Sequence, residues 1–353
     1  MKKYDVVFVL PMPTLKIVGG YKMIYEYANY IEEKGKSVCI VYNGVKGKNS
    51  KHFPHILVYI FRILLGHIGP NWFKLNRKVN RKVIYSFNEK YIPYCDKIIA
   101  STARSAVFVN SIQRKAEKKF YFIQGFENWE ISTEKLYETY SFDMKKITVA
   151  KWLKKEIEKY SNESTEYIPN GINTEIFKVN KEPDKRNPHS IALLYHLDSQ
   201  KGFDVSYKVI NKLKRVYPDL VVNMFGSPEK NLNWPEWIHY TRNASPLEVS
   251  NIMNDSVVFL CTSRMEGYGL TGLESLFCGC QLVSTKCLGV QEYATEQSAL
   301  LCDIDDVESI FENVCKAFDD ERLRYQMLTE FEKYKKFFKI EKAKEKFYEV
   351  VME

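Results

Sequence analysis

The sequence predicts an α/β protein of two Rossmann-like domains, each built on a parallel sheet, that face each other across a cleft. Short apolar strands alternate with amphipathic helices, a pattern that favours parallel βαβ units. The alternation runs in two successive series, and 353 residues exceed what one ordinary core requires. We place the domains at residues 1–178 and 179–336, with a polar linker at 180–190. A terminal helix at about 337–353 is expected to pack back on the first domain.

The first domain opens with one such βαβ unit. Val6–Leu10 is an apolar strand, and Leu15–Gly20 is a loop that ends in a glycine pair. Apolar residues then recur at the spacing of one helix face until Gly35, which ends the helix, and Val38–Tyr42 forms the next strand. Further strands of this domain are expected at 97–101, 120–124 and 147–149.

The second domain repeats the alternation. Ser245, followed by a proline and then by Glu248, has the pattern of a capping box at a helix start. An amphipathic helix that includes Ala343 and Val351 closes the sequence. Strands of the second domain are expected at 191–195, 220–225 and 257–261.

Positive charge is concentrated in the first half of the sequence. Residues 1–150 contain 25 Lys and Arg against 12 Asp and Glu, whereas the remaining residues contain 27 against 32. This half is therefore expected to meet an anionic partner. An insertion at 51–90 is interpreted either as a helical pair that covers the sheet with a solvated basic face, or as an element that lies on anionic lipid. Its candidate membrane and acceptor residues are Lys74, Arg77, Lys78, Arg81 and Lys82.

The composition excludes several classes of protein. No apolar stretch reaches the roughly 20 residues that span a bilayer, and no segment has the pattern of an export signal. The eight cysteines are scattered, as is typical of free thiols in a reducing compartment. Cys278, Cys280 and Cys287 lack a fourth ligand at zinc-like spacing. We expect a cytoplasmic protein, peripheral on the inner face of the plasma membrane, that needs no metal or cofactor and binds no nucleic acid.

The segment Thr262–Gly279 carries the clearest chemistry. A glycine-rich loop, Glu266–Thr271, follows an apolar strand and leads into a helix. The free N–H groups and the positive dipole end of such a helix attract phosphate. Glu266 and Glu274 bracket the loop, and carboxylates are suited to accept hydrogen bonds from sugar hydroxyls. The pattern predicts a site for a nucleotide sugar; alternatively, both glutamates only balance the helix dipole.

The stretch that begins at Glu266, E-G-Y-G-L-T-G-L-E, resembles the E-x7-E signature of retaining glycosyltransferase family 4, whose members have the GT-B fold. The resemblance covers residues 4 to about 315, and includes bacterial surface-polysaccharide and rhamnosyltransferase-like members. Its other landmarks are Gly19-Gly20, Phe120–Glu127, Lys146–Leu153, Ile168–Asn173, Lys201–Asp204 and Phe225-Gly226.

The resemblance implies a retaining, metal-independent transfer from a UDP, GDP or dTDP sugar to a glycan or polyprenyl-linked acceptor. It implies that Glu274 holds the ribose hydroxyls, that Glu266 holds the transferred sugar, and that Lys201 neutralises the diphosphate. The implied catalytic residues are Glu266, Lys201 and Gln124. The implied donor-binding residues are Gly19, Gly20, His196, Lys201, Gly226, Arg242, Glu266, Gly267, Tyr268, Gly269, Leu270, Thr271 and Glu274.

The sequence departs from the family at two places, and it contains one motif of another transferase fold. His196 stands where the family usually has an arginine, and it replaces that cation only when protonated. Gln124 occupies the place of a frequent histidine and cannot act as a base. Asp303 and Asp305 spell a D-x-D that binds metal in another transferase fold; here we interpret the pair as a loop and helix N-cap.

Other functions stay open at this point. A sugar-nucleotide epimerase of related architecture would need acid or base groups in the first domain, but His52, His55 and His67 all lie in the basic insertion. A catalytically inactive carbohydrate- or nucleotide-binding subunit is the non-enzymatic alternative. A nicotinamide-dependent oxidoreductase is disfavoured because the first strand is not followed by G-x-G-x-x-G.

Overall fold

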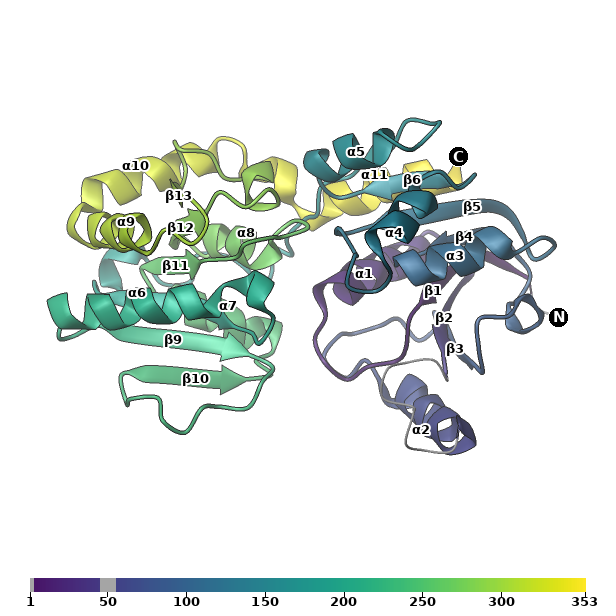
Figure 1. The fold of residues 1–353 in the computed structure, drawn as a ribbon, viewed down its shortest axis with the longest axis horizontal. Helices are drawn as coiled ribbons and strands as arrows, with labels where there is room; N and C mark the ends of the chain where they lie inside the picture. The colour runs from purple at the N-terminus through teal and green to yellow at the C-terminus, as the bar shows by residue number, and fades with distance from the viewer. Residues whose placement is uncertain (1–2, 45–54) are drawn as a thin grey trace. The chain divides into compact units, whose positions relative to one another are not determined.

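The computed structural model describes residues 3–44 and 55–353, and His52 therefore lies outside the described part. The chain forms two compact units, shown in Figure 1. The first comprises Met1–Pro169 together with Lys344–Glu353, and the second comprises Asn170–Ala343. The C-terminal helix α11 (Ile340–Met352) begins in the second unit and continues in the first.

The first unit is built on a parallel sheet with the order β3-β2-β1-β4-β5-β6-β7. The sheet core is apolar, and residues 6–10 of β1 have no exposed surface, as expected for a strand covered on both faces. The strands are β1 (Tyr4–Leu10), β2 (Val38–Asn43), β3 (Asn80–Ile84), β4 (Cys95–Ala100), β5 (Ala116–Ile123), β6 (Lys145–Thr148) and β7 (Glu166–Tyr167). The helices of this unit are α1 (Gly19–Glu33), α2 (His55–Ile68), α3 (Ala103–Ser111), α4 (Thr133–Tyr140) and α5 (Lys151–Glu158).

The second unit has a six-stranded parallel sheet with the order β10-β9-β8-β11-β12-β13. Its strands are β8 (Ser190–Tyr195), β9 (Val221–Gly226), β10 (Ile238–Arg242), β11 (Val258–Cys261), β12 (Gln281–Thr285) and β13 (Leu300–Cys302). Its helices are α6 (Phe203–Val216), α7 (Pro246–Asn254), α8 (Leu270–Phe277), α9 (Val307–Asp319) and α10 (Glu321–Glu332).

The two sheets share the doubly wound topology, which confirms the prediction of two parallel-sheet α/β domains. In the first sheet, β2 and β3 lie on one side of β1, and β4 to β7 lie on its other side. In the second sheet, β9 and β10 lie on one side of β8, and β11 to β13 lie on its other side. The strand order therefore reverses between β1 and β4 and between β8 and β11. Ligands of such sheets bind beyond the carboxyl ends of the strands at this reversal. The topology therefore predicts that a ligand binds at the loops that follow these strands.

Two local sequence signals are confirmed. Gly35 has φ of 81°, the left-handed conformation that ends a helix, and α1 stops at Glu33. Ser245 accepts a hydrogen bond from the Glu248 amide while the Glu248 carboxylate accepts from the Ser245 amide, so the predicted capping box begins α7.

The C-terminal helix packs on the first unit. The Phe347 ring stacks on Tyr27 at 3.9 Å between centroids and meets the edge of Phe122 at 5.5 Å. Lys344 forms an ion pair of 2.8 Å with Glu26 of α1. An aromatic cluster and a largely buried ion pair thus hold this helix to the first unit.

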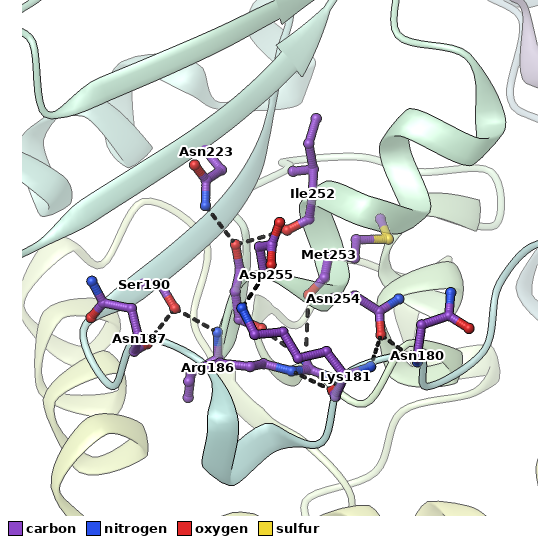
Figure 2. A network of polar contacts seen from close by, with 12 residues as sticks. Asn180, Lys181, Arg186, Asn187, Ser190, Asn223, Ile252, Met253, Asn254 and Asp255 are labelled. Carbon is purple, nitrogen blue, oxygen red and sulfur yellow. Dashed lines mark hydrogen bonds and ion pairs between the residues drawn. The ribbon is translucent and has the colours of Figure 1, made fainter.

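The polar stretch Asn180–Ser190, expected to be a linker, forms part of the second unit. Arg186 is 4% exposed and donates a hydrogen bond of 2.7 Å to the carbonyl oxygen of Lys181 (Figure 2). It also donates to the carbonyl oxygens of Ser256 at 2.9 Å and Cys278 at 2.7 Å. A buried guanidinium that satisfies several carbonyl groups ties the stretch to its neighbours.

The basic insertion also differs from the expected helical pair. Its apolar part is α2, but its second part ends in β3, an edge strand that contains Arg81 and Lys82. The glycine pair likewise opens α1 at Gly19 rather than ending a loop. Within residues 3–44 and 55–353, no helix has the length and apolar character needed to cross a bilayer.

Candidate donor site in the second unit

The site begins with two loops at the carboxyl ends of β8 and β11. The loop after β8 ends in a short 3-10 turn, Ser199–Lys201, and in Gly202 with φ of 63°. Thr262, just after β11, donates its hydroxyl to the Gly202 carbonyl at 2.8 Å, and the Arg264 amide donates to the Gln200 carbonyl at 2.7 Å. A Cβ on Gly202 would lie 2.8 Å from the Thr262 carbonyl carbon. Only glycine therefore allows the loops to approach this closely.

An ion pair joins the two loops. Lys201 Nζ lies 2.9 Å from Glu266 Oε1 and 2.8 Å from Oε2, and the Ser263 hydroxyl donates to Oε1 at 2.8 Å. The side chains of Lys201 and Glu266 are 26% and 10% exposed. Burial by itself lowers the pKa of Lys201, but the charge of Glu266 and its hydrogen bonds outweigh this effect, so the pKa lies above its ordinary value. Lys201 is therefore a fixed cation.

The N-terminus of α8 lies directly after this loop. Gly269 adopts φ of 82° before the first helical residue, and its carbonyl accepts a hydrogen bond of 2.6 Å from the Tyr293 hydroxyl. The backbone amides of Leu270 and Thr271 have no acceptor among the residues that the structure describes. Unpaired amides at a helix start are donors for an anionic ligand.

Glu274 lies one turn into α8 and is 6% exposed. Tyr268 is also buried, whereas Gly267, Leu270 and Thr271 are partly exposed. The predicted donor residues Gly267, Leu270 and Thr271 are thus accessible to a ligand, and Glu274 keeps a small exposed surface.

His196 follows β8 and is half-buried. Its Nδ1 accepts a hydrogen bond from the Asp198 amide at 3.0 Å, which leaves Nε2 as the donor of the neutral ring. Burial lowers the pKa of His196 below 6.5, and the nearby charge of Lys201 lowers it further. At neutral pH this residue offers a neutral hydrogen-bond donor and not a second cation.

Gly226 and Arg242 lie at the same carboxyl edge, on β9 and β10, and are paired in register. A Cβ on Gly226 would lie 3.1 Å from the Tyr195 carbonyl carbon and closer still to its oxygen. Arg242 is exposed and forms an ion pair of 2.7 Å with Glu229.

The first unit brings together the other predicted residues. Gln124, at the end of β5, donates from Nε2 to the carbonyl oxygen of Gly20 at 3.2 Å. A Cβ on Gly20 would lie 3.2 Å from the same nitrogen, so the glycine leaves room for the amide. Gly19 and Gly20 form the first turn of α1 at the carboxyl edge of this sheet.

Arg264 is a structural residue of the site that the sequence did not indicate. Its guanidinium binds Asp204 at 2.8 Å and Asp305 at 2.8 Å, and so fixes the loop that carries Glu266. Asp305, the second aspartate of the D-x-D, has φ of 65° and forms its ion pair with Arg264. The N-cap of α9 is Asp306, which corrects the expectation that the D-x-D supplies it. Across the described residues no three His, Cys, Asp or Glu side chains are grouped as metal ligands.

The basic residues of the insertion do not act as one group. Lys74, Arg77 and Arg81 line a hollow of about 230 Å³ at the C-terminal end of α2. Lys78 instead lies 3.7 Å from Glu32, and Lys82 donates to the Tyr91 carbonyl at 2.8 Å.

Residues 173–336 match the family described as glycosyl transferases group 1. The match lies within the second unit, Asn170–Ala343. The matched region contains the loops after β8 and β11 and all of α8.

Curated glycosyltransferases are similar in sequence to this chain over part of their length. A component of the human phosphatidylinositol N-acetylglucosaminyltransferase is 30% identical over 160 residues, which are 42% of this chain and 32% of that protein. An uncharacterized glycosyltransferase of Haemophilus influenzae is 29% identical over 147 residues, which are 39% of this chain and 42% of that protein. The chain thus matches less than half the length of these relatives.

Solved structures establish the fold of the whole chain as GT-B. HepE of Anabaena, in complex with UDP and glucose, superposes with a TM-score of 0.73 at 12% identity, covering 99% of both chains. Sucrose-phosphate synthase of Thermosynechococcus elongatus gives 0.73 at 11% identity over 98% of both chains. TarM gives 0.75 at 9% identity over 99% of this chain and 98% of that one.

Proposed function

We propose that this chain transfers a glycosyl group from a nucleotide-sugar donor to an acceptor. The observation that carries the proposal is the Lys201–Glu266 ion pair, which joins two loops beside the N-terminus of α8 in a group 1 domain. A cation, unpaired amides and a carboxylate are the groups that a sugar diphosphate needs. The neighbours solved in complex with UDP or UDP-glucose support a nucleotide donor here.

The Lys201–Glu266 ion pair also indicates how the donor binds. Lys201 is neutralised by Glu266 before a ligand arrives. The donor diphosphate carries more charge than one carboxylate and takes Lys201 as its counter-ion, together with the amides at the start of α8. Glu266 then accepts hydrogen bonds from hydroxyls of the transferred sugar, and Glu274 accepts them from the hydroxyls of the ribose.

The chemical step in this proposal separates the sugar from its diphosphate. Negative charge grows on the leaving oxygen, and Lys201 and the dipole of α8 stabilise that charge because they are already in place. We propose retention of configuration, with the departing phosphate taking the acceptor proton on the same face of the sugar. Gln124 then positions the acceptor as a hydrogen-bonding amide, since an amide takes no proton at neutral pH. No metal enters this step.

We further propose a glycan or lipid-linked acceptor, in bacterial surface-polysaccharide assembly. The name of the human relative includes phosphatidylinositol, a lipid, which supports a lipid acceptor for a related domain. The excess of Lys and Arg in residues 1–150 also favours an anionic, phosphate-bearing acceptor.

A donor panel tests the proposal. UDP-, GDP-, dTDP- and ADP-sugars are first ranked by thermal shift, and the stabilising donor is then incubated with glycan and polyprenyl-phosphate acceptors. Product mass identifies transfer, and NMR of the new anomeric centre identifies retention. Lys201→Gln and Glu266→Ala should abolish transfer, while the exposed Lys208→Gln on α6 serves as the matched control.

Three results would reject the proposal. A donor altered at one sugar carbon without any acceptor would identify an epimerase. Donor binding without transfer to any acceptor would identify a protein that only binds its ligand. Failure of every donor to stabilise the protein would remove the donor site itself.

A further inference from the structure

Helix α2 presents an apolar face to solvent. Six of its large apolar side chains are each 48–65% exposed: Ile56, Leu57, Ile60, Phe61, Leu64 and Ile68. Their spacing places them along one side of the helix. A continuous exposed apolar surface of this kind marks a site of interaction rather than ordinary surface.

The other side of α2 is fixed on the first sheet at its carboxyl edge. A Cβ on Gly66 would lie 2.5 Å from Val83 Cγ2 of β3, and the Tyr59 hydroxyl donates to the Val83 carbonyl at 3.3 Å. A Cβ on Gly69 would lie 3.0 Å from Leu15 Cδ2 in the loop after β1. Leu15 and its neighbours Ile17 and Val18 are exposed by 38–41%, so this loop extends the apolar surface.

Cations border this surface. The hollow at the C-terminal end of α2 combines Ile68 and Phe73 with Lys74, Arg77 and Arg81. From His55 to Asn88, which covers α2 and β3, the sequence contains six Lys and Arg and no Asp or Glu. An apolar face that is bordered by an excess of positive charge is complementary to an anionic lipid surface.

We propose that α2 docks the protein on a bilayer that contains anionic phospholipid. The apolar face of α2 enters the boundary between headgroups and acyl chains, and Lys74, Arg77 and Arg81 bind headgroup phosphates at its end. A second copy of the chain is a poorer occupant, because it would bring two basic borders together. Docking does not depend on the proposed transfer, but it would bring the carboxyl edge of the first sheet to the membrane, where a lipid-linked acceptor resides.

Vesicle flotation of the full chain tests the proposal. The probes are vesicles of phosphatidylcholine alone and vesicles of phosphatidylcholine with an equal part of phosphatidylglycerol. The wild type should float with the anionic vesicles and much less with the neutral ones. Because one cation strengthens partitioning to an anionic surface about fivefold, Lys74→Gln/Arg77→Gln should weaken binding to anionic vesicles about 25-fold.

The apolar contribution is tested separately. Phe61→Gln/Leu64→Gln should lower partitioning to anionic vesicles about tenfold or more, since both side chains leave water on docking. Both positions are exposed, so folding is preserved, and thermal unfolding verifies this. Val107→Gln/Trp129→Gln removes exposed apolar groups elsewhere on the same unit, and Lys34→Gln/Lys36→Gln removes charge before β2 at the amino edge. Both controls should float like the wild type.

Three outcomes would overturn the assignment. They are a wild type that stays unbound with anionic vesicles, flotation that is unchanged by Phe61→Gln/Leu64→Gln, and controls that fall as far as the test variants. Sedimentation velocity without lipid tests whether a second copy of the chain binds the apolar face of α2. A wild-type dimer that Phe61→Gln/Leu64→Gln converts to monomer would assign the face to a second copy. Nucleotide-sugar binding by the docking variants should stay normal, which separates failure of docking from failure of the proposed function.

Discussion

Replacing Gly202 with alanine should damage the second unit at the point where its two site loops meet. The left-handed backbone, with φ of 63°, costs a non-glycine residue about 1–2 kcal/mol. The added Cβ would also lie 2.8 Å from the Thr262 carbonyl carbon, and crowding of that kind costs a further ~1–3 kcal/mol. The sum is a loss of about 2–5 kcal/mol, and the forced separation of the loops moves Lys201 away from Glu266.

Gly35→Ala is the matched control for this substitution. Gly35 has φ of 81°, but a Cβ there would meet nothing within 4 Å, so it bears only the conformational cost of about 1–2 kcal/mol. Thermal unfolding should therefore show the larger loss for Gly202→Ala, at about 2–4 °C per kcal/mol in domains of this size. Nucleotide affinity should fall for Gly202→Ala alone. Equal losses of stability, or unchanged affinity in Gly202→Ala, would refute the proposed contact between the loops.

Three further predictions concern burial, charge and metal. Burial raises the pKa of Glu127 well above 4.5, so the native state keeps a proton that the unfolded chain releases, and stability falls as pH rises above 4.5. Glu127→Gln should remove this slope and raise the melting temperature at pH 7; an unchanged slope would contradict the assignment. Arg186→Ala should cost about 3–5 kcal/mol in urea unfolding because it leaves buried carbonyl groups unpaired, whereas the exposed Arg215→Ala should cost little. Transfer should persist in EDTA, and activity that is lost there and restored by Mg²⁺ would reverse the expectation of a metal-independent step.

The sequence predicted the strands that are buried on both faces, because such strands are short continuous apolar runs. Val6–Leu10 and 257–261 are examples, and the structure places strands at both. It did not indicate β3, whose residues Asn80–Ile84 include an arginine and a lysine. An edge strand needs to bury only one side, so its sequence lacks the apolar run that identifies a central strand.

The polar stretch at 180–190 was misinterpreted for a related reason. Prolines and charges are typical of linkers, but Arg186 is buried because backbone carbonyls of three separate segments surround it. Carbonyl groups belong to every residue, so no sequence pattern marks where they converge. The structure alone assigns this arginine to the interior of the second unit.

The candidate site was predictable where its residues lie close in sequence, and less so where folding assembles it. The glycine-rich turn and its two glutamates form one continuous segment. Lys201 was implied only by family resemblance, and its bond to Glu266 joins residues 65 positions apart. Arg264, which binds Asp204 and Asp305, gave no signal because each partner reads as an ordinary surface charge.

The ion pair provides the most direct test of the account, through titration calorimetry of a nucleoside diphosphate without its sugar. UDP is the first probe, followed by the diphosphate that the donor panel selects. Lys201→Gln should weaken binding about tenfold or more, because it removes a charge-assisted hydrogen bond to phosphate. Glu266→Gln should instead strengthen binding, since it removes the carboxylate that competes for Lys201. Weakening by both substitutions, or by neither, would contradict the claim that the diphosphate takes Lys201 from Glu266.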